Sequence, residues 1–317
     1  MKVSIKHRLE YGCFRLLVFA QGLVPEVLAY GFVAVLGQIY FMCSRRRQRF
    51  ALKFLRQAYP EGKTDRELLT LGRKSMGNIM KVVIDMIRVP GVLRRGTFFE
   101  TLDGEDELVE ALGDEPAILV SGHLGSWEIG AICAALVTEE SHVIGRRFKN
   151  PLLQEHLEES RRFAGLHLHP RRGGIRGLAR ALKNGAFVIQ AVDQNQRLRG
   201  LFVPFFGKVA STDRAAASLA VRERRPIIVC SCIRTGRGFR FRYRVHRILR
   251  PRSPVDRGDV ARAVEELVEQ TNRCLEDVIL TYPDQYLWVH DRYRTQPDPS
   301  EADTNRAGAQ CAGSEAS

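Results

Sequence analysis

Apolar residues recur in short unbroken runs along the middle of the chain. Between these runs lie amphipathic segments, such as 152–165 and 175–185, whose apolar positions have helical spacing. Strands that are apolar on both faces and alternate with helices are typical of an α/β fold, with a mostly parallel central sheet flanked by helices. The runs are PAILVSGH (116–123), SHVIGRR (141–147), GAFVIQAVDQ (185–194) and RPIIVCSCIR (225–234).

Other patterns predict three further elements. Thr64 or Asp65 caps a helix that we expect to stop at Pro90, and a late helix over 259–280 closes the domain. Residues 238–247 alternate aromatic with basic side chains, which predicts a strand with an apolar inner and a basic outer face. That face is either solvated or a dock for an acidic partner. A surface on which RNA bases stack exposes aromatic and basic side chains on the same face. The alternation therefore argues against nucleic-acid binding.

The stretch 27–43 carries no charge and is followed by SRRRQR. Its length is near the lower limit of about 17 residues for a membrane span. A spanning or interfacial anchor, a signal peptide and a buried core helix are the alternatives, and no small-residue cleavage site follows the apolar run. We predict the anchor, with the basic flank and the bulk of the chain on the cytoplasmic side.

The predicted organisation is an anchor with its basic flank over 1–50, one globular domain over 51–295 and a disordered tail over 296–317. The chain has 317 residues, of which 44% are hydrophobic, and a net charge of +13. That charge attracts nucleic acid, anionic lipid or an acidic protein. Seven cysteines without a C-x-x-C pattern indicate a reducing compartment and no zinc site.

The stretch GHLGSWE combines His123 with Glu128 at the predicted passage from a strand to a helix. The two side chains can meet if Gly122 and Gly125 form a tight turn and Ser126 begins the helix. A carboxylate on one imidazole nitrogen would make the other nitrogen a general base. Because G-x-S-x-G and H-E-x-x-H are absent from the sequence, the base is expected to serve a substrate hydroxyl.

GHLGSWE resembles the catalytic motif of the lysophospholipid acyltransferase superfamily, in the form found in the late acyltransferases of lipid A biosynthesis. The resemblance extends from Tyr11 to Pro297. It departs from the family at Val192, where proline is usual, and near Arg214, where a glycine is common. The further matching stretches are GRRFKNPLL with Arg146, the helix with Arg161, the strand end with Asp193 and Gln194, FVPFFG, and WVHDR with Trp288, His290 and Arg292.

The resemblance implies acyl transfer from a thioester, acyl-ACP or acyl-CoA as co-substrate, to a hydroxyl of a lipid A precursor. No other cofactor and no metal is expected. His123 would be the base and Glu128 its orienting partner, with the N–H of Gly125 or an arginine stabilising the oxyanion. Arg146 and Arg161 would position phosphate or the donor.

Asp193 and Gln194 would line the substrate site at a strand end. The implied partners are an acidic acyl carrier protein, an anionic glycolipid and the inner membrane, with no nucleic acid. The alternatives are an acyltransferase for another lipid, namely a phosphatidylinositol mannoside, a lysophospholipid or an ornithine lipid, and a non-catalytic membrane-surface protein that binds polyanions.

Overall fold

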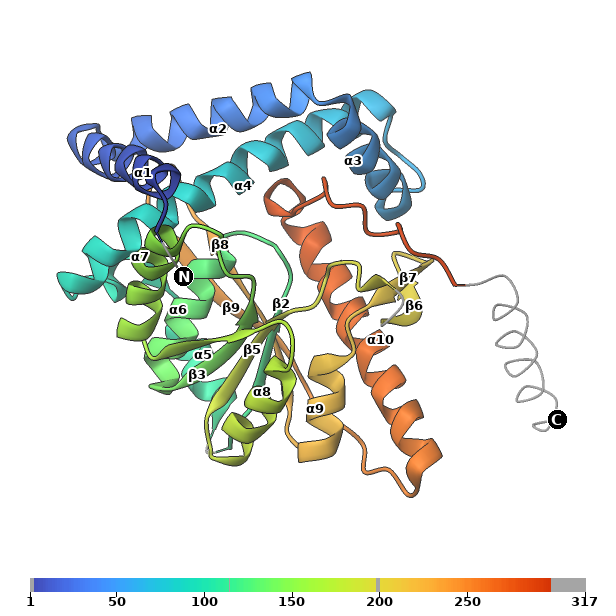
Figure 1. The fold of residues 1–317 in the computed structure, drawn as a ribbon. Helices are drawn as coiled ribbons and strands as arrows, with labels where there is room; N and C mark the ends of the chain where they lie inside the picture. Colours follow the sequence, from blue (N-terminus) through green and yellow to red (C-terminus); the bar gives the residue numbers. More distant parts are fainter. Residues whose placement is uncertain (1–2, 114, 198–199, 298–317) are drawn as a thin grey trace.

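The computed structural model describes residues 3–113, 115–197 and 200–297 (Figure 1). The tail predicted to be disordered therefore lies outside the described residues, apart from its first two positions. The helices are α1 (Ile5–Leu23), α2 (Glu26–Cys43), α3 (Arg45–Ala58), α4 (Asp65–Arg94), α5 (Glu105–Leu112), α6 (Trp127–Thr138), α7 (Pro151–Phe163), α8 (Gly174–Lys183), α9 (Ala215–Glu223) and α10 (Arg257–Thr281), with the short 3-10 helices η1 (Phe99–Thr101) and η3 (Pro283–Gln285). The strands are β1 (Leu102–Asp103), β2 (Ile118–Ser121), β3 (Ser141–Gly145), β4 (Leu166–Pro170), β5 (Phe187–Ala191), β6 (Leu201–Phe205), β7 (Lys208–Thr212), β8 (Ile227–Arg234) and β9 (Phe241–Leu249).

In the described ranges the main sheet has seven strands in the order β1-β9-β8-β2-β5-β3-β4, and β6 pairs with β7 in a separate hairpin. Every neighbouring pair in the main sheet is parallel except β8 and β9, which are antiparallel. The predicted mostly parallel α/β sheet is therefore confirmed. The carboxyl ends of β2, β5, β3 and β4 all meet at one edge of the sheet, where α/β proteins bind their ligands.

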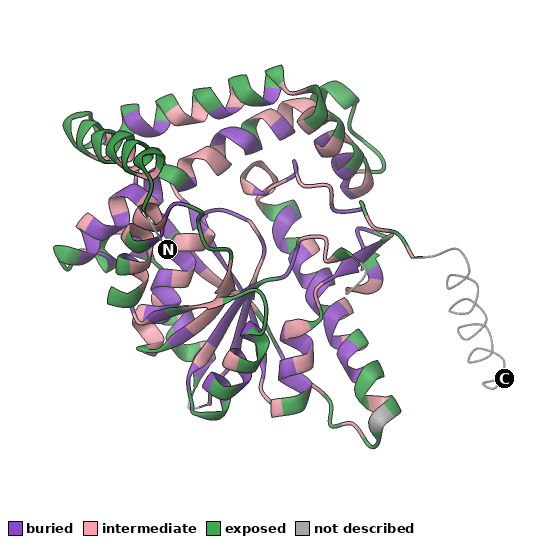
Figure 2. Ribbon diagram, viewed as in Figure 1, coloured by how far each residue is buried: buried purple, intermediate pink, exposed green. Residues whose placement is uncertain are grey.

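Helices cover both faces of this sheet because successive strand side chains point to opposite sides. Ile118 and Val120 of β2 pack in one core with residues of α8, α9 and α10, whereas Leu119 packs in a second core with α5 and α6. Figure 2 shows the buried strands between these helical layers. Residues of α4 enter both cores, so this helix joins the two.

Helix α4 does not stop at Pro90 as expected but continues to Arg94. A proline inside a helix costs about 3 kcal/mol through a lost hydrogen bond and a steric clash. Val89, Val92 and Leu93 around it are buried in the second core. Their burial offsets the cost of the proline, an effect that local propensity does not register.

Helix α2 is, within the described chain, the one helix long and apolar enough to cross a membrane. One of its faces packs along α4, where Tyr30 and Phe41 are buried. A Cβ at Gly37 would lie 2.7 Å from the carbonyl oxygen of Met76, so the two helices approach closely. The other face of α2, together with most of α1, is exposed (Figure 2).

Candidate active site

His123 lies just beyond the carboxyl end of β2, in a turn that leads into α6. Gly125 has φ +60°, and a Cβ there would lie 2.1 Å from the carbonyl oxygen of Cys232. The amide of Gly125 donates to the Gln285 carbonyl at 3.0 Å, and the amide of Ser126 donates to the Cys232 carbonyl at 2.9 Å. The predicted passage from strand through glycine turn to helix is confirmed, and neighbouring segments hold the turn from two sides.

Asp193 supplies the carboxylate that contacts His123. It follows β5, the neighbour of β2, so parallel pairing brings the two strand ends together. One carboxylate oxygen lies 2.7 Å from imidazole Nδ1, and the other accepts the backbone N–H of His123 at 2.9 Å. Burial raises the pKa of Asp193, but the charge and hydrogen bonds of His123 outweigh it and lower the pKa to about 2. Asp193 therefore remains ionised.

Gln194 faces the other nitrogen of the ring. Its Nε2 lies 3.1 Å from His123 Nε2. With the Nδ1 proton donated to Asp193, Nε2 carries a lone pair that accepts this amide N–H, a tautomer assigned from the hydrogen-bond network. The arrangement is that of a general base whose accepting nitrogen is directed away from its carboxylate partner.

The prediction that Glu128 contacts the imidazole of His123 is wrong. Both Glu128 carboxylate oxygens accept from Nη2 of Arg161, at 2.9 and 2.8 Å. The helix begins at Trp127, which places Glu128 in the first turn as expected, but its side chain pairs with α7 instead of the ring. Burial lowers the pKa of His123, the charges of Asp193 and Glu128 raise it, and the net change is a rise. Glu128 thus acts on His123 through its charge.

Two further site residues differ from expectation. The amide of Gly125 is engaged by Gln285 and is not directed at a substrate. Arg161 is held by Glu128, with only 12% of its side chain exposed. Arg146 lies in the exposed segment after β3 and, within the described ranges, forms no ion pair. Of the two arginines, Arg146 is therefore the one available to a ligand.

The closing W-x-H-x-R motif fastens the loop that carries Asp193. His290 Nε2 accepts the backbone N–H of Asn195 at 3.0 Å. The buried Arg292 donates to the Ser211 carbonyl at 2.7 Å and to the Thr212 hydroxyl at 2.6 Å. The closing motif therefore also binds the end of β7. The motif was visible in the sequence, but its positioning contacts were not.

A buried ion pair that the sequence does not reveal also supports the turn. Asp85 of α4 accepts the Ser126 hydroxyl at 2.7 Å and the Tyr30 hydroxyl at 2.6 Å, and it also pairs with Arg234 at the end of β8. No local pattern marks Asp85, because its partners come from α2, from the turn before α6 and from β8. Helix α2 is thereby linked to the turn that carries His123.

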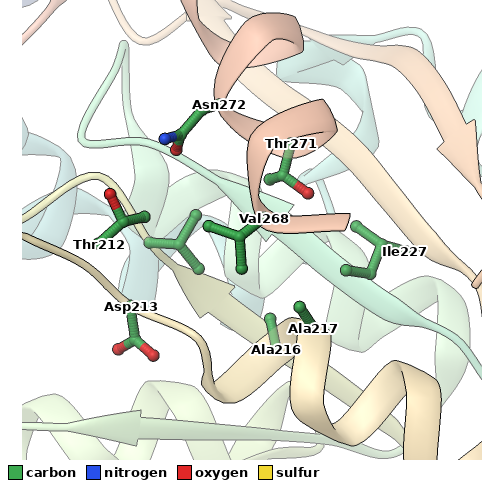
Figure 3. A pocket seen from close by; sticks show the side chains of 9 residues that line it. Thr212, Asp213, Ala216, Ala217, Ile227, Val268, Thr271 and Asn272 are labelled. Carbon is green, nitrogen blue, oxygen red and sulfur yellow. The ribbon is translucent and has the colours of Figure 1, made fainter. Parts of the chain in front are cut away.

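The cavity near the loop that carries Asp193 is too small for a lipid substrate. It lies between α9 and α10 beside Asp213 (Figure 3), and its lining does not include His123. Its volume of about 10 Å³ leaves room for about one water molecule. Phe205 and Phe206 next to α10 belong to the core and pack on Phe54.

A metal centre finds no ligand set in the part of the chain that the structure describes, since no three His, Cys, Asp or Glu side chains there could hold an ion. The chemistry open to these residues is proton transfer at His123 Nε2, with Asp193 balancing the imidazolium charge.

Comparison with known proteins gives consistent matches. The family model described as bacterial lipid A biosynthesis acyltransferase matches residues 7–295. The chain is 26% identical over 204 residues to the lipid A biosynthesis palmitoleoyltransferase of Escherichia coli (strain K12), which covers 62% of each chain. It is 22% identical over 276 residues to lipid A biosynthesis acyltransferase 2 of Shigella flexneri, covering 86% of this chain and 85% of that protein.

A solved structure also aligns with the chain. The 1-acyl-sn-glycerophosphate acyltransferase of Thermotoga maritima matches with 15% identity and a TM-score of 0.36, over 85% of this chain and 98% of the other.

Proposed function

The chain belongs to the bacterial lipid A biosynthesis acyltransferase family, and from that membership we propose that it transfers a fatty acyl group from a thioester to a hydroxyl of a lipid A precursor. The observation that best supports this reaction is the His123–Asp193 pair at the carboxyl edge of the sheet, with imidazole Nδ1 and the carboxylate oxygen 2.7 Å apart. Acyl transfer to a hydroxyl needs such a base and no metal or redox group.

In the proposed mechanism, His123 Nε2 takes the hydroxyl proton as the oxygen attacks the thioester carbonyl. Asp193 holds the ring and stabilises the imidazolium, while Glu128 adds negative charge nearby. The tetrahedral intermediate then expels the thiolate, which receives the proton from His123. The products are the ester and the free thiol.

The oxyanion of this intermediate needs a hydrogen-bond donor close to the base. The Gln194 side-chain amide, 3.1 Å from His123 Nε2, is in that place. We assign it this role instead of the Gly125 amide, because the latter is occupied by Gln285. When the acceptor hydroxyl takes the position next to Nε2, the amide is free to donate to the developing negative charge.

The proposed donor is acyl carrier protein or coenzyme A, and the proposed location is the cytoplasmic face of the inner membrane. The exposed apolar faces of α1 and α2 support membrane association. The net charge of +13 supports the encounter with an acidic carrier protein and an anionic lipid. Rising salt should then lower kcat/KM more than kcat, since screening acts on the encounter.

The test measures transfer from radiolabelled acyl carrier protein to a Kdo-containing lipid A precursor in membranes that hold equal amounts of each variant. Wild type and His167→Ala, an exposed histidine on β4, should form product, and His123→Ala should lose on the order of a hundredfold or more. Equal product from His123→Ala would contradict the mechanism.

Two competing functions remain distinguishable in the same assay. If wild type forms product with another acceptor and none with the lipid A precursor, mass analysis of that product identifies a different lipid substrate. If His123→Ala preserves the cellular effect of the protein, the non-catalytic polyanion-binding role is favoured.

A further inference from the structure

Arg146 and Arg171 lie at equivalent places on neighbouring strands. β3 and β4 pair in parallel with Gly145 opposite Pro170, the last residue of each strand. Arg146 and Arg171 are the next residues along the two chains, and paired strands lie about 4.8 Å apart. Both residues are exposed at the carboxyl edge of the sheet. The two arginines therefore leave the sheet from adjacent backbone positions, on the edge that carries His123.

Acidic side chains do not neutralise this pair. Within the described ranges, neither Arg146 nor Arg171 forms an ion pair or a side-chain hydrogen bond. Arginines nearby do find partners, since Arg147 pairs with Glu158 at 3.7 Å and Arg161 pairs with Glu128 at 2.8 Å. Two adjacent cations that make no ion-pair contact repel each other, and an anion bound between them removes that repulsion.

One member of the pair, Arg171, is close enough to His123 for its charge to act on the base. Burial lowers the pKa of His123. The charges of Asp193 and Glu128 raise it, so that the net change is an increase, and the Arg171 cation opposes this increase. The same cation acts on Asp213, whose pKa is raised by burial. Arg171, on the loop between β4 and α8, therefore lies within electrostatic range of the reaction centre although it is exposed.

We propose that Arg146 and Arg171 together bind a phosphate group of the substrate and so place the reacting hydroxyl or thioester at His123. Two planar guanidinium forks match the oxygens of one phosphate, and charge-assisted bonds of this kind are among the strongest in proteins. The phosphate comes either from the acceptor lipid or from the phosphopantetheine arm of the donor. This subsite rests on the proposed acyl transfer and adds Arg171 to it.

The experiment compares Arg171→Ala, Arg146→Ala and the double variant with Arg180→Ala. Arg180 is an exposed arginine near the end of α8, so its removal changes the net charge equally. Kinetics are measured with phosphorylated and dephosphorylated acceptor, and with acyl-phosphopantetheine and acyl-pantetheine as donors. Binding of phosphorylated acceptor in detergent is measured by calorimetry, independently of turnover.

Arg171→Ala should raise KM for the phosphate-bearing substrate about tenfold or more, with Lys in place of Ala recovering part of the loss. Removing the phosphate from that substrate should raise KM of the wild type by a similar factor. It should raise KM of Arg171→Ala little further. The substrate for which this holds identifies the source of the phosphate. Removing the Arg171 cation should raise the pKa of His123 and so move the acid limb of the kcat/KM profile to higher pH. The other charged groups that act on His123 are the anions Asp193 and Glu128, and His290 is neutral at the working pH.

A change no larger than that of Arg180→Ala, or one equally large on substrates without phosphate, overturns the subsite. If wild type forms no product, the proposed acyl transfer fails, and calorimetry decides the subsite alone. Weaker binding of the phosphorylated acceptor by Arg171→Ala, with Arg180→Ala unchanged, then supports it, and unchanged or absent binding overturns it.

Discussion

The carboxylate of Asp193 accepts hydrogen bonds from both the ring and the backbone amide of His123, at 2.7 and 2.9 Å. It thereby fixes the position of the turn as well as the tautomer of the ring. Only 2% of its side chain is exposed, so water does not compete for these bonds. Glu128 has its own partner in Arg161 and reaches the imidazole only through its charge.

Replacing these two carboxylates should therefore have unequal effects. Asp193→Asn should lower kcat/KM on the order of a hundredfold or more, because the amide no longer compensates the imidazolium and can favour the wrong tautomer. Glu128→Gln should cost less than about tenfold, since it removes a charge and the ion pair with Arg161 but no contact with the imidazole. Steady-state kinetics on folded variants, checked by circular dichroism, decides the order. A greater loss in Glu128→Gln would assign the orienting role to Glu128.

The pH dependence of turnover should report the raised pKa of His123. The base must be neutral to take a proton, so kcat/KM should increase through that pKa and level off above it. This acid limb should lie above the usual imidazole value of about 6.5. Asp193→Asn removes the anion that favours the imidazolium, so the limb should move to lower pH. A limb that does not move would mean that another group titrates.

At the scale of elements, the turn from β2 to α6 depends on Gly125. Gly125→Ala should lower the free energy of unfolding by more than about 2 kcal/mol, because the new Cβ would lie 2.1 Å from the Cys232 carbonyl oxygen. Gly185 is a matched control, with φ +94° and no atom within 4 Å of an added Cβ. Gly185→Ala should cost about 1 kcal/mol from backbone strain alone. Equal losses in urea unfolding would show that the close contact at Gly125 relaxes freely.

The Asp85–Arg234 pair holds the same turn against α2 and α4. Asp85→Ala should lower stability by about 3–5 kcal/mol, since it leaves a buried guanidinium without a counter-charge. Adding Arg234→Met should recover much of that loss. Glu155→Ala, which breaks an exposed pair with Arg162, should change stability little. Thermal unfolding of the four proteins tests this, and a double variant no more stable than Asp85→Ala would refute it.

Elements with strong local periodicity were predictable from the sequence, whereas contacts between distant segments were not. The apolar runs over 116–123 and 185–194 gave β2 and β5, and the parallel order placed their ends together. The β6–β7 hairpin was missed because Pro204 and the central glycine interrupt its pattern. Pro90 predicts an end of helix α4 that burial of the neighbouring residues overrides.

The same division applies to the candidate site. His123 and the turn were visible as a local motif, and Asp193 was named at a strand end, but only the packing of β2 beside β5 pairs them. Proximity in the sequence favours Glu128 as the partner of His123, whereas the fold supplies Asp193. Asp85 and Arg234 are 149 residues apart and carry no local signal, so their pairing required the three-dimensional structure.

At the scale of the whole molecule, the N-terminal helices give the domain an apolar surface on one side. Phe19 of α1 and Phe32 of α2 are 66% and 65% exposed, although both are large apolar residues. An exposed surface of this extent is typical of a site that meets a membrane or another protein. Because α2 also packs on α4 and contributes Tyr30 to the Asp85 network, this surface is fixed relative to the active-site edge.

Apolar side chains on α2 should therefore hold the whole domain at the bilayer. Leu28, Phe32 and Ile39 form one exposed stripe, and replacing all three with Ser removes on the order of 1.5 kcal/mol of burial in lipid per side chain. The partition coefficient onto vesicles with anionic lipid should fall at least about a hundredfold.

The control replaces three exposed apolar residues away from α1 and α2 with Ser, and it should partition like wild type. These residues are Val109, Ile248 and Val255. Flotation of both variants with vesicles measures the difference, and turnover on detergent-dispersed acceptor should stay near the wild-type value because the stripe lies outside the His123 site. If the α2 variant floats as well as the control, the anchoring surface lies elsewhere. If it also loses turnover in detergent, the stripe supports the fold through the α2–α4 contact and is not simply a surface for lipid.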